Sequence, residues 1–336
     1  MGLGQIFGFL PHFIYSQLFI TPPVPRTDCT GKTVIVTGSN TGLGREAVRH
    51  YVRLNAERVV LACRSSEKGE AAKNDIEAST QRRGVVEVWP LDLSDYQSVK
   101  AFAARASELK RLDMVILNAG INTNRFVNMA GNESSITVNV VSTFLLGLLL
   151  LPKLRESGHH FNMTPTVTVV SSEVHHFTEF SERHSPVIFD RLNDPETARM
   201  RERYLVSKLI EVLVCREIAR EHPIERMRVT LNFVNPGLCQ TELTREVAEK
   251  PSSMVIAFLK MITRYLSRTS EVGARTLVHA GLCGPETHGK YLSDCRVEPC
   301  APLVEGEEGP EIQRRVWQEL FEKLKDIEPK VTEIME

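Results

Sequence analysis

The sequence lacks an excess of charge of either sign and contains few cysteines. In its 336 residues, 41 lysines and arginines oppose 42 aspartates and glutamates, which leaves a formal net charge of −1. This balance gives no general electrostatic reason to expect nucleic acid or an anionic membrane as a partner. The seven cysteines are odd in number, scattered and without a C-x-x-C pair. Such a set argues against a disulfide framework and a zinc site, and it fits a reducing, cytoplasmic compartment.

Long hydrophobic runs are also missing. The N-terminal stretch QIFGFLPHFIYSQLFI, residues 5–20, is 16 residues long and contains Pro11 and His12. It is short for a bilayer span, and no basic region precedes it as in a secretory signal. We interpret it as a helical arm packed on the protein's own surface, with attachment to a membrane surface as the less favoured alternative. The run VVSTFLLGLLLLPKL, residues 140–154, is also short and predicts a buried helix.

Short β-branched runs alternate with helical segments from residue 31 onward. Strands are predicted at residues 32–38, 57–64, 85–92, 112–120, 166–172 and 228–237, and helices at 44–55, 66–80 and 96–110. This alternation predicts right-handed βαβ units and a parallel sheet covered by helices on both faces. The expected fold is α/β: a doubly wound, Rossmann-like sheet in a single domain at residues 30–300. An apolar arm and linker at 1–29 precede it, and a helical tail at 301–336 follows.

A glycine-rich turn follows the first predicted strand. The stretch TGSNTGLG places Gly38, Gly42 and Gly44 between that strand and the first helix. The order G-x-x-x-G-x-G differs from the usual G-x-G-x-x-G. A turn without side chains nevertheless lets the backbone approach a pyrophosphate at the positive end of a helix. Its position between strand and helix therefore predicts a dinucleotide site. The turn residues Ser39, Asn40 and Leu43 are expected to line it.

The end of the second predicted strand bears on the choice of dinucleotide. NAD enzymes usually keep a carboxylate about twenty residues after the turn, where it binds the ribose 2′-hydroxyl. Here Arg64 stands at that point, in LACRSSEKGE. An arginine can pair with a 2′-phosphate through charge-assisted hydrogen bonds, so NADP(H) is the predicted cofactor. Lys68 and Arg45 are candidate helpers, with a solvated surface charge as the alternative for each.

Five ordered motifs resemble the short-chain dehydrogenase/reductase family. They are TGSNTGLG, NAG, VVSS, YLVSK and NPG, and the resemblance covers about residues 30–295. The stretches LACRSSEKGE, SSEVHH and FDRLND further resemble the retinol-dehydrogenase-like branch, which leans towards NADP. A looser likeness, carried by ITPPVP and VWQELFEKLKDIEP, is to fungal members that are often tied to secondary metabolism.

The resemblance implies a role for each residue that matches a motif. Tyr204 would be the general acid and base, Lys208 would lower its pKa and bind the nicotinamide ribose, and Ser172 would bind the substrate oxygen. Ser171 would keep a structural role in the turn, and Asn139, in ITVNVVS, would belong to a proton-relay network. The further cofactor-binding residues implied are Asp92, Leu93, Asn118, Ala119, Gly120, Pro236, Gly237 and Thr241. Of these, Asp92 would meet the adenine and Thr241 the carboxamide.

The chemistry of Tyr204 and Lys208 also follows from physical principles. Four residues apart on a predicted helix at 201–221, they share one face. Alone, such a pair is more often a surface tyrosine beside a solvated lysine. A free phenol has a pKa of about 10, and a neighbouring ammonium together with an oxidised nicotinamide lowers it. In the reductive direction Tyr204 would protonate the carbonyl oxygen, and Ser172 would donate a hydrogen bond to the charge that develops there.

One spacing departs from the family pattern. Ser172 and Tyr204 are 204 − 172 = 32 positions apart, which is more than the family usually shows. We interpret the intervening residues as a surface loop near the substrate mouth. Its histidines, His175 and His176, lack further ligands at metal spacing, so no metal is expected. No G-x-S-x-G elbow surrounds Ser172, which argues against a serine hydrolase.

The expected function is therefore NADP(H)-dependent hydride transfer to or from a carbonyl or alcohol carbon of a hydrophobic small molecule. The apolar residues 126–129 and a predicted helix at 254–266 would form the pocket and its lid. Two alternatives use the same fold without catalysis: an NADP sensor and a membrane-peripheral scaffold. Family analogy also predicts a homodimer or homotetramer, with residues 140–151 and the Tyr204 helix as candidate interfaces.

Overall fold

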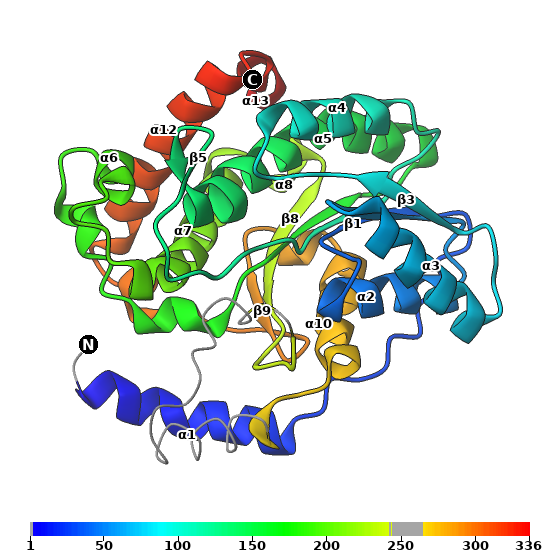
Figure 1. Cartoon of the computed structure of the whole chain (residues 1–336), viewed down its shortest axis with the longest axis horizontal. Coiled ribbons are helices and arrows are strands. Elements are labelled where there is room, and N and C mark those ends of the chain that lie inside the picture. Colours follow the sequence, from blue (N-terminus) through cyan, green and yellow to red (C-terminus); the bar gives the residue numbers. More distant parts are fainter. Residues whose placement is uncertain (1–2, 242, 244–264) are drawn as a thin grey trace.

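The computed structural model describes residues 3–241, 243 and 265–336. Its centre is an eight-stranded sheet in the order β10-β9-β8-β7-β4-β1-β2-β3 (Figure 1). All neighbouring strands are parallel except β9 and β10, which pair antiparallel. The strands are β1 (Thr33–Thr37), β2 (Arg58–Cys63), β3 (Val86–Pro90), β4 (Met114–Leu117), β7 (Thr166–Val170), β8 (Thr230–Asn235), β9 (Tyr291–Ser293) and β10 (Arg296–Val297). The predicted doubly wound parallel sheet is confirmed.

Alternate residues of the strands supply two separate hydrophobic cores. In β1, Val34 and Val36 belong to one core, and Ile35 between them belongs to the other. This follows from the period of two in a strand, which sends successive side chains to opposite faces. The first core is closed by α2 (Gly42–Arg53), α3 (Ser66–Thr80) and α10 (Ser270–Leu282). The second is closed by α4 (Tyr96–Ser107), α5 (Ser142–Phe161) and α7 (Met200–Glu221) (Figure 1).

Helix α5 continues a short π-helical turn, η1 (Ile136–Val141), and together they form an apolar stretch of membrane-spanning length. Ile136–Phe161 is the one such stretch within the described residues, and 89% of its most apolar window is buried inside the protein. It packs between α4 and the sheet, as the core helix of a layered α/β domain does. The predicted buried helix at 140–154 is therefore confirmed, although it extends to Phe161.

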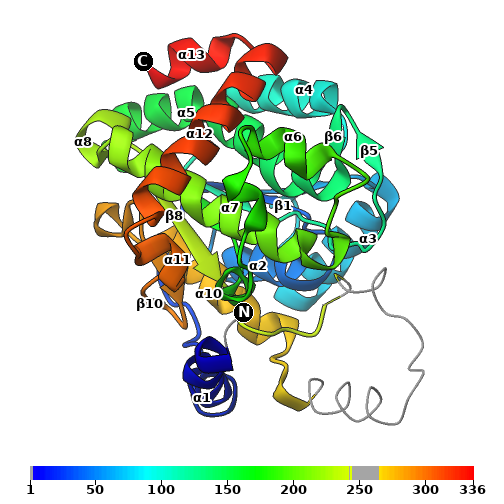
Figure 2. The same ribbon diagram turned by 90° about the vertical axis from the view of Figure 1, so that its left-hand side faces the viewer.

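The C-terminal residues fold back over the second core. They form α11 (Pro302–Glu305), α12 (Gly309–Ile327) and α13 (Lys330–Met335), and Figure 2 shows α12 crossing α7. The inward face of α12 buries Ile312, Val316, Leu320 and Leu324, which recur at the four-residue spacing of one helical face. α13 packs on α5. The oligomerisation expected through α5 and α7 stays a prediction.

The segment between Ser172 and Tyr204 is folded rather than a plain surface loop. It contains the 3₁₀ turns η2 (Glu173–Phe177) and η3 (Ser181–His184) and the short helix α6 (Ile188–Asn193). Phe180, Phe189 and Leu192 are fully buried. The interpretation as a surface loop was wrong because these apolar side chains reach the core beside α12.

The remaining described elements are short or terminal. A small hairpin pairs β5 (Asn128–Met129) with β6 (Asn132–Glu133), α8 (Ile224–Met227) leads into β8, and η5 (Pro285–Thr287) precedes β9. The N-terminal helix α1 (Leu3–Phe19) lies outside the sheet, and its buried Ser16 hydrogen-bonds Asp294 just after β9 (Figure 1). The helix predicted at 254–266 falls almost entirely outside the described residues.

Candidate active site

The glycine-rich turn between β1 and α2 forms a cradle that only glycine fits. Gly38 and Gly42 have positive φ angles of 63° and 56°. A Cβ on Gly44 would lie 2.6 Å from the Gly38 carbonyl oxygen and 2.7 Å from Nδ2 of Asn118. That amide nitrogen donates a hydrogen bond of 2.9 Å to the Thr37 carbonyl, so the residues after β4 brace the turn after β1. The backbone amides at the start of α2 are thereby held open for an anion, as a dinucleotide pyrophosphate requires.

The other turn residues are placed differently around this cradle. Ser39 is buried, and its hydroxyl donates to the Val36 carbonyl at 2.7 Å, so its side chain serves the turn itself. Asn40 is partly exposed, and Leu43 packs against the first core. Thr241 approaches the turn from the loop after β8, since a Cβ on Gly42 would lie 3.7 Å from its methyl group. These contacts bring Thr241 and the glycine-rich turn to the same side of the sheet.

Two basic side chains stand at the carboxyl end of β2. Arg64 is exposed directly after the strand, and it forms no ion pair with another described residue. Lys68 is exposed in the first turn of α3, where its backbone amide donates to the Ser65 side chain. The third candidate, Arg45, is engaged: it lies 3.4 Å from Glu46 and 3.8 Å from Asp75. Arg64 and Lys68 are therefore the cations available to a phosphate here.

The loop after β3 presents Asp92 and hides Leu93. The Asp92 carboxylate accepts hydrogen bonds from the backbone and hydroxyl of Ser94, at 2.9 and 2.7 Å. The Leu93 side chain belongs to the second core, and its carbonyl accepts from the Ser142 hydroxyl. Only the backbone of Leu93 can therefore contribute to a nucleotide site.

The loop after β8 turns sharply at the sequence Asn235-Pro236-Gly237. Gly237 has a φ of 78°, and its amide donates to Oδ1 of Asn235 at 3.0 Å. A Cβ on Gly237 would lie 2.7 Å from the Arg268 guanidinium, so a side chain has no room there. The glycine allows this turn at the carboxyl end of β8, beside the end of β7.

Ser172 and Tyr204 meet at the carboxyl end of β7. Ser172 follows that strand directly, and its hydroxyl accepts a hydrogen bond from the Val174 amide and contacts the Tyr204 side chain. Burial has the largest effect on the pKa of Tyr204 and raises it, and the charge of Glu211 raises it further. The charge of Lys208 and the hydrogen bond with Ser172 lower this pKa. The net direction is upward. The phenol is therefore protonated at neutral pH and can act as an acid.

Lys208 lies one turn further along α7, below the Tyr204 ring. Its Nζ is 5.7 Å from the ring centroid and donates to the Val170 carbonyl at the end of β7 at 2.8 Å. A second donation of 2.8 Å goes to Oε1 of Glu211. Burial lowers the pKa of Lys208, but the charges of Glu211 and Tyr204 raise it, and the net direction is upward. The side chain is therefore a fixed cation beside the phenol.

Asn139 connects α7 to the segment that follows β4. It lies in the π-helical turn η1, a kind of irregularity that is often found at functional sites. Its side chain accepts from the Ile121 amide at 2.8 Å and donates to the Ser207 hydroxyl on α7 at 3.0 Å. A Cβ on Gly120 would lie 3.3 Å from Oδ1 of Asn139 and 3.8 Å from Nζ of Lys208. The side chains of Asn139 and Lys208 thus both approach Gly120, and the relay role that the resemblance implies for Asn139 stays a prediction.

Comparisons with known proteins agree with this arrangement. The sequence pattern of the short chain dehydrogenase family matches residues 32–175. The short chain dehydrogenase/reductase dmxR8 of Cryptosporiopsis sp. is 49% identical over 326 residues, covering 95% of this chain and 98% of its own. The chain belongs to the short-chain dehydrogenase/reductase family. A second fungal family member, atnD of Emericella nidulans, is 48% identical over 293 residues, covering 85% of this chain and 91% of its own.

Solved structures share the family fold. A crystal structure of an uncharacterized Mycobacterium paratuberculosis protein superposes with a TM-score of 0.63 at 25% identity, covering 89% of this chain and 96% of its own. An NADPH-bound carbonyl reductase from chicken fatty liver superposes with a TM-score of 0.57 at 19% identity, covering 82% and 99%. The latter likeness supports the fold alone.

Two carboxylates of this short-chain dehydrogenase/reductase, one buried and one partly buried, were missed by the sequence reasoning. Glu211 is 2% exposed on α7, and burial raises its pKa to about 7. Glu173 follows Ser172, burial raises its pKa to about 7 as well, and Asn235 donates to it at 3.4 Å. The signal for Glu211 was a single acidic residue within the otherwise apolar stretch LIEVLV that follows Lys208. For Glu173 the sequence held no such signal.

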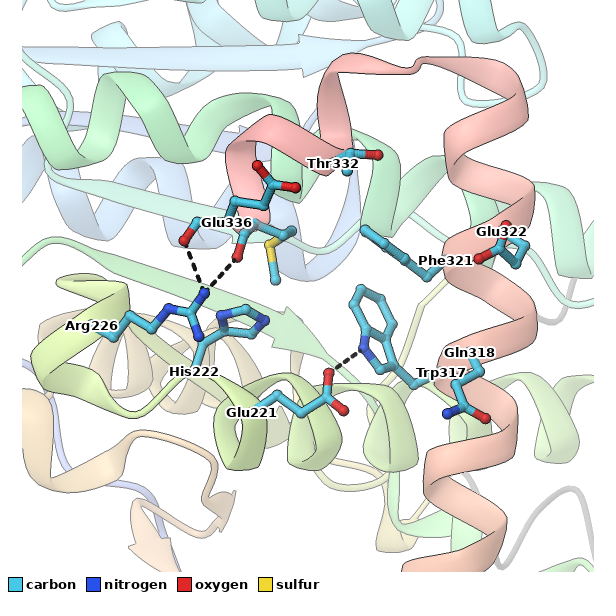
Figure 3. A pocket seen from close by; sticks show the side chains of 10 residues that line it. Glu221, His222, Arg226, Trp317, Gln318, Phe321, Glu322, Thr332 and Glu336 are labelled. Carbon is cyan, nitrogen blue, oxygen red and sulfur yellow. Dashed lines mark hydrogen bonds between the residues drawn. The ribbon is translucent and has the colours of Figure 1, made fainter.

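A cavity of about 320 Å³ lies at the opposite end of α7 (Figure 3). Its lining includes Glu221, His222, Arg226, Trp317, Phe321 and Glu336. Trp317 donates to Glu221 at 2.9 Å, and Arg226 donates to the Glu336 carbonyl at 2.8 Å (Figure 3). Glu221 stands 17 residues after Tyr204, about 25 Å along a helix that rises 1.5 Å per residue. This cavity is therefore separate from the site around Tyr204.

Proposed function

We propose that this protein is an NADP(H)-dependent carbonyl reductase or alcohol dehydrogenase that acts on hydrophobic small molecules. The observation that carries the proposal is the meeting of Ser172, Tyr204 and Lys208 at the carboxyl end of β7, beside Gly120 and the glycine cradle. A non-catalytic NADP sensor would need the cradle but would have no use for these three side chains together. Their contacts therefore favour an enzyme over a sensor on the same fold.

The cofactor would be held along the carboxyl ends of β1, β2 and β4. The cradle of Gly38 and Gly44 fits a pyrophosphate because a Cβ would fill the space. Arg64, with Lys68, is suited to the 2′-phosphate of NADP, since no carboxylate occupies the position after β2 that binds a 2′-hydroxyl in NAD enzymes. Bound NADPH would supply the hydride.

The residues of the chain would handle the proton and the developing charge. In reduction, the Tyr204 phenol donates its proton to the substrate oxygen, and the hydroxyl of Ser172 donates a hydrogen bond to the same oxygen. Lys208 stabilises the phenolate that remains, because its ammonium lies on the same helix face within a few ångströms. In oxidation each proton moves in the opposite direction, and the phenolate is the base.

A cofactor-consumption screen tests this proposal. Purified protein would be incubated with NADPH or NADH and a panel of apolar aldehydes and ketones, and loss of the reduced nicotinamide would be followed by absorbance. We expect carbonyl-dependent consumption of NADPH that exceeds that of NADH at equal concentration. Consumption of neither nucleotide above the carbonyl-free control, in a preparation that binds NADPH, would favour a sensor instead.

A further inference from the structure

A buried carboxylate stands directly behind the lysine of the active site. Glu211 lies three residues after Lys208 on α7, and its two oxygens are 2.8 and 3.1 Å from Nζ of Lys208. Both side chains are almost fully buried, at 2% and 6% exposure. A carboxylate at such depth is strongly disfavoured unless a cation and hydrogen bonds compensate it. Lys208 supplies the cation, so the two residues form one unit.

The first serine of the Ser171-Ser172 doublet belongs to the same unit. Ser171 is buried, contacts the Glu211 carboxylate and donates its hydroxyl to the Lys208 carbonyl at 3.0 Å. Lys208 Nζ also donates to the Val170 carbonyl, so two of its three N–H groups are directed towards β7 and Glu211. The ammonium is thereby fixed in position, and its charge interacts more strongly with the Glu211 carboxylate than with the Tyr204 phenol.

We propose that Glu211 is a positioning residue that acts through Lys208: it anchors the ammonium beside Tyr204 and offsets its charge, so that less positive charge acts on the phenol. This inference rests on the proposed role of Tyr204 as proton donor. A tyrosine facing an uncompensated lysine would ionise more easily, whereas one facing the Lys208–Glu211 pair remains an acid ready for carbonyl reduction.

Other ionisable groups also lie near the Lys208–Glu211 pair. On α7 itself, Cys215 faces it as a neutral thiol, since burial raises its pKa well above the ordinary value. From η2, His175 is neutral, because burial lowers its pKa to about 3. Also in η2, Glu173 accepts a hydrogen bond from Asn235, and His176 is neutral because burial lowers its pKa to about 4. Strand β8 and the turn η1, which also pack on α7, carry no ionisable side chain. Helix α12 packs on α7 as well, and of its charged side chains Arg314 pairs with Glu311 and Arg315 with Glu319. Lys208 is the cation that pairs with Glu211, and the charge of Glu211 raises the pKa of both Tyr204 and Cys215.

Titration of Tyr204 tests the proposal without substrate or cofactor. The near-ultraviolet absorbance of phenolate would be followed against pH, and the spectrum of the Tyr204→Phe protein would be subtracted to isolate one of the six tyrosines. In Glu211→Gln the Tyr204 midpoint should fall by about one pH unit or more, because a nearby negative charge is removed. In Glu211→Asp, where a shorter side chain keeps the charge further from Lys208, it should fall by less.

Glu217→Gln is the matched control. Glu217 is also buried on α7, but it pairs with Arg220 and accepts from Gln313 at 2.7 Å, away from the active site. The Tyr204 midpoint should not move in this variant. An unchanged or raised midpoint in Glu211→Gln, or an equal fall in Glu217→Gln, overturns the proposal. If Glu211→Gln does not fold, the proposal is overturned by an unchanged Tyr204 midpoint in Glu211→Asp.

The pH profile of alcohol oxidation gives a second readout. The acid limb of kcat/KM should shift in Glu211→Gln in the same direction as the absorbance midpoint, while NADPH affinity, measured by fluorescence, changes less than about threefold. An acid limb that stays in place overturns the proposal. If the wild-type protein binds NADPH but consumes none above the carbonyl-free control with any carbonyl tested, the proposed function fails, and the absorbance titration still decides the role of Glu211.

Discussion

Arg268 and Asp294 form a buried ion pair, with 2.6 Å between Nη2 and Oδ1, that fastens the N-terminal helix to the sheet. The Ser16 hydroxyl donates to Asp294 at 2.5 Å, and Arg268 donates to the carbonyls of Ser16 and Ile20 at 2.9 and 3.1 Å. The end of α1 therefore completes a polar cluster that would otherwise be left partly unpaired.

Replacing Asp294 by alanine should lower the free energy of unfolding by about 3–5 kcal/mol, because Arg268 would remain as a buried charge without its carboxylate. Urea denaturation checks this. As a control, Glu322→Ala breaks an exposed pair with Lys325 and should change stability by less than about 1 kcal/mol. Equal effects of the two changes would show that the α1 anchor contributes little.

The glycine cradle predicts a selective loss of cofactor binding. In Gly44→Ala, the new methyl group would have to displace the Gly38 carbonyl, 2.6 Å from its ideal position. We expect NADPH affinity to fall at least about tenfold, an effect of about 1.4 kcal/mol, as measured by nicotinamide fluorescence. Gly84→Ala is the control: Gly84 has a φ of 76°, so alanine is strained there, but nothing lies within 4 Å of its Cβ. It should lower stability without changing NADPH affinity.

Arg64 should distinguish the two nicotinamide dinucleotides. In Arg64→Ala, the dissociation constant of NADPH should rise about tenfold or more, since a charge-assisted hydrogen bond contributes about 1.5–3 kcal/mol, while that of NADH should not change. Arg58, at the start of the same strand, pairs with Glu87 at 2.8 Å and serves as the control. Equal losses for NADPH and NADH in Arg64→Ala would place the 2′-phosphate elsewhere.

Glu173 should make the free energy of unfolding decrease as pH rises from acid to neutral. Burial raises its pKa to about 7, above the ordinary value of 4.5. The folded protein therefore binds this proton more tightly than the unfolded protein does. The contribution of protonated Glu173 to the free energy of unfolding is complete below about pH 4.5 and is lost as pH rises through about 7. Relative to wild type, the free energy of unfolding of Glu173→Gln should rise on the order of 2 kcal/mol as pH increases across this range. This figure is reduced from the full pKa difference because the Glu173 side chain is partly exposed to solvent. A difference that does not vary with pH would contradict the assignment.

The sequence predicted the parts of the fold that are set by local pattern. β1, β2 and β7 are β-branched runs bounded by turn residues, and α3 begins and ends at the predicted residues 66 and 80. The resemblance carried by the ordered motifs named Tyr204, Lys208 and Ser172, and the structure brings these three side chains together at the carboxyl end of β7.

The features that were missed depend on contacts between distant residues. β9 has three residues and β10 two, too few to show a periodicity. The anchor of Ser16 on Asp294 joins residues 278 positions apart, and no local pattern encodes it. Glu211 could have been noticed as an acid in an apolar stretch, but its approach to Lys208 depends on the position of β7 behind the helix.

The Tyr204→Phe protein gives the most direct test of the central claim, which is that the Tyr204 phenol transfers the proton. Turnover of a carbonyl substrate with NADPH would be measured beside wild type, with NADPH binding followed by fluorescence in both. We predict unchanged binding, because the ring and its contacts remain, and a loss of kcat of about 10²–10⁴-fold, the usual contribution of a general acid. A variant that binds NADPH and turns over at the wild-type rate would contradict the mechanism.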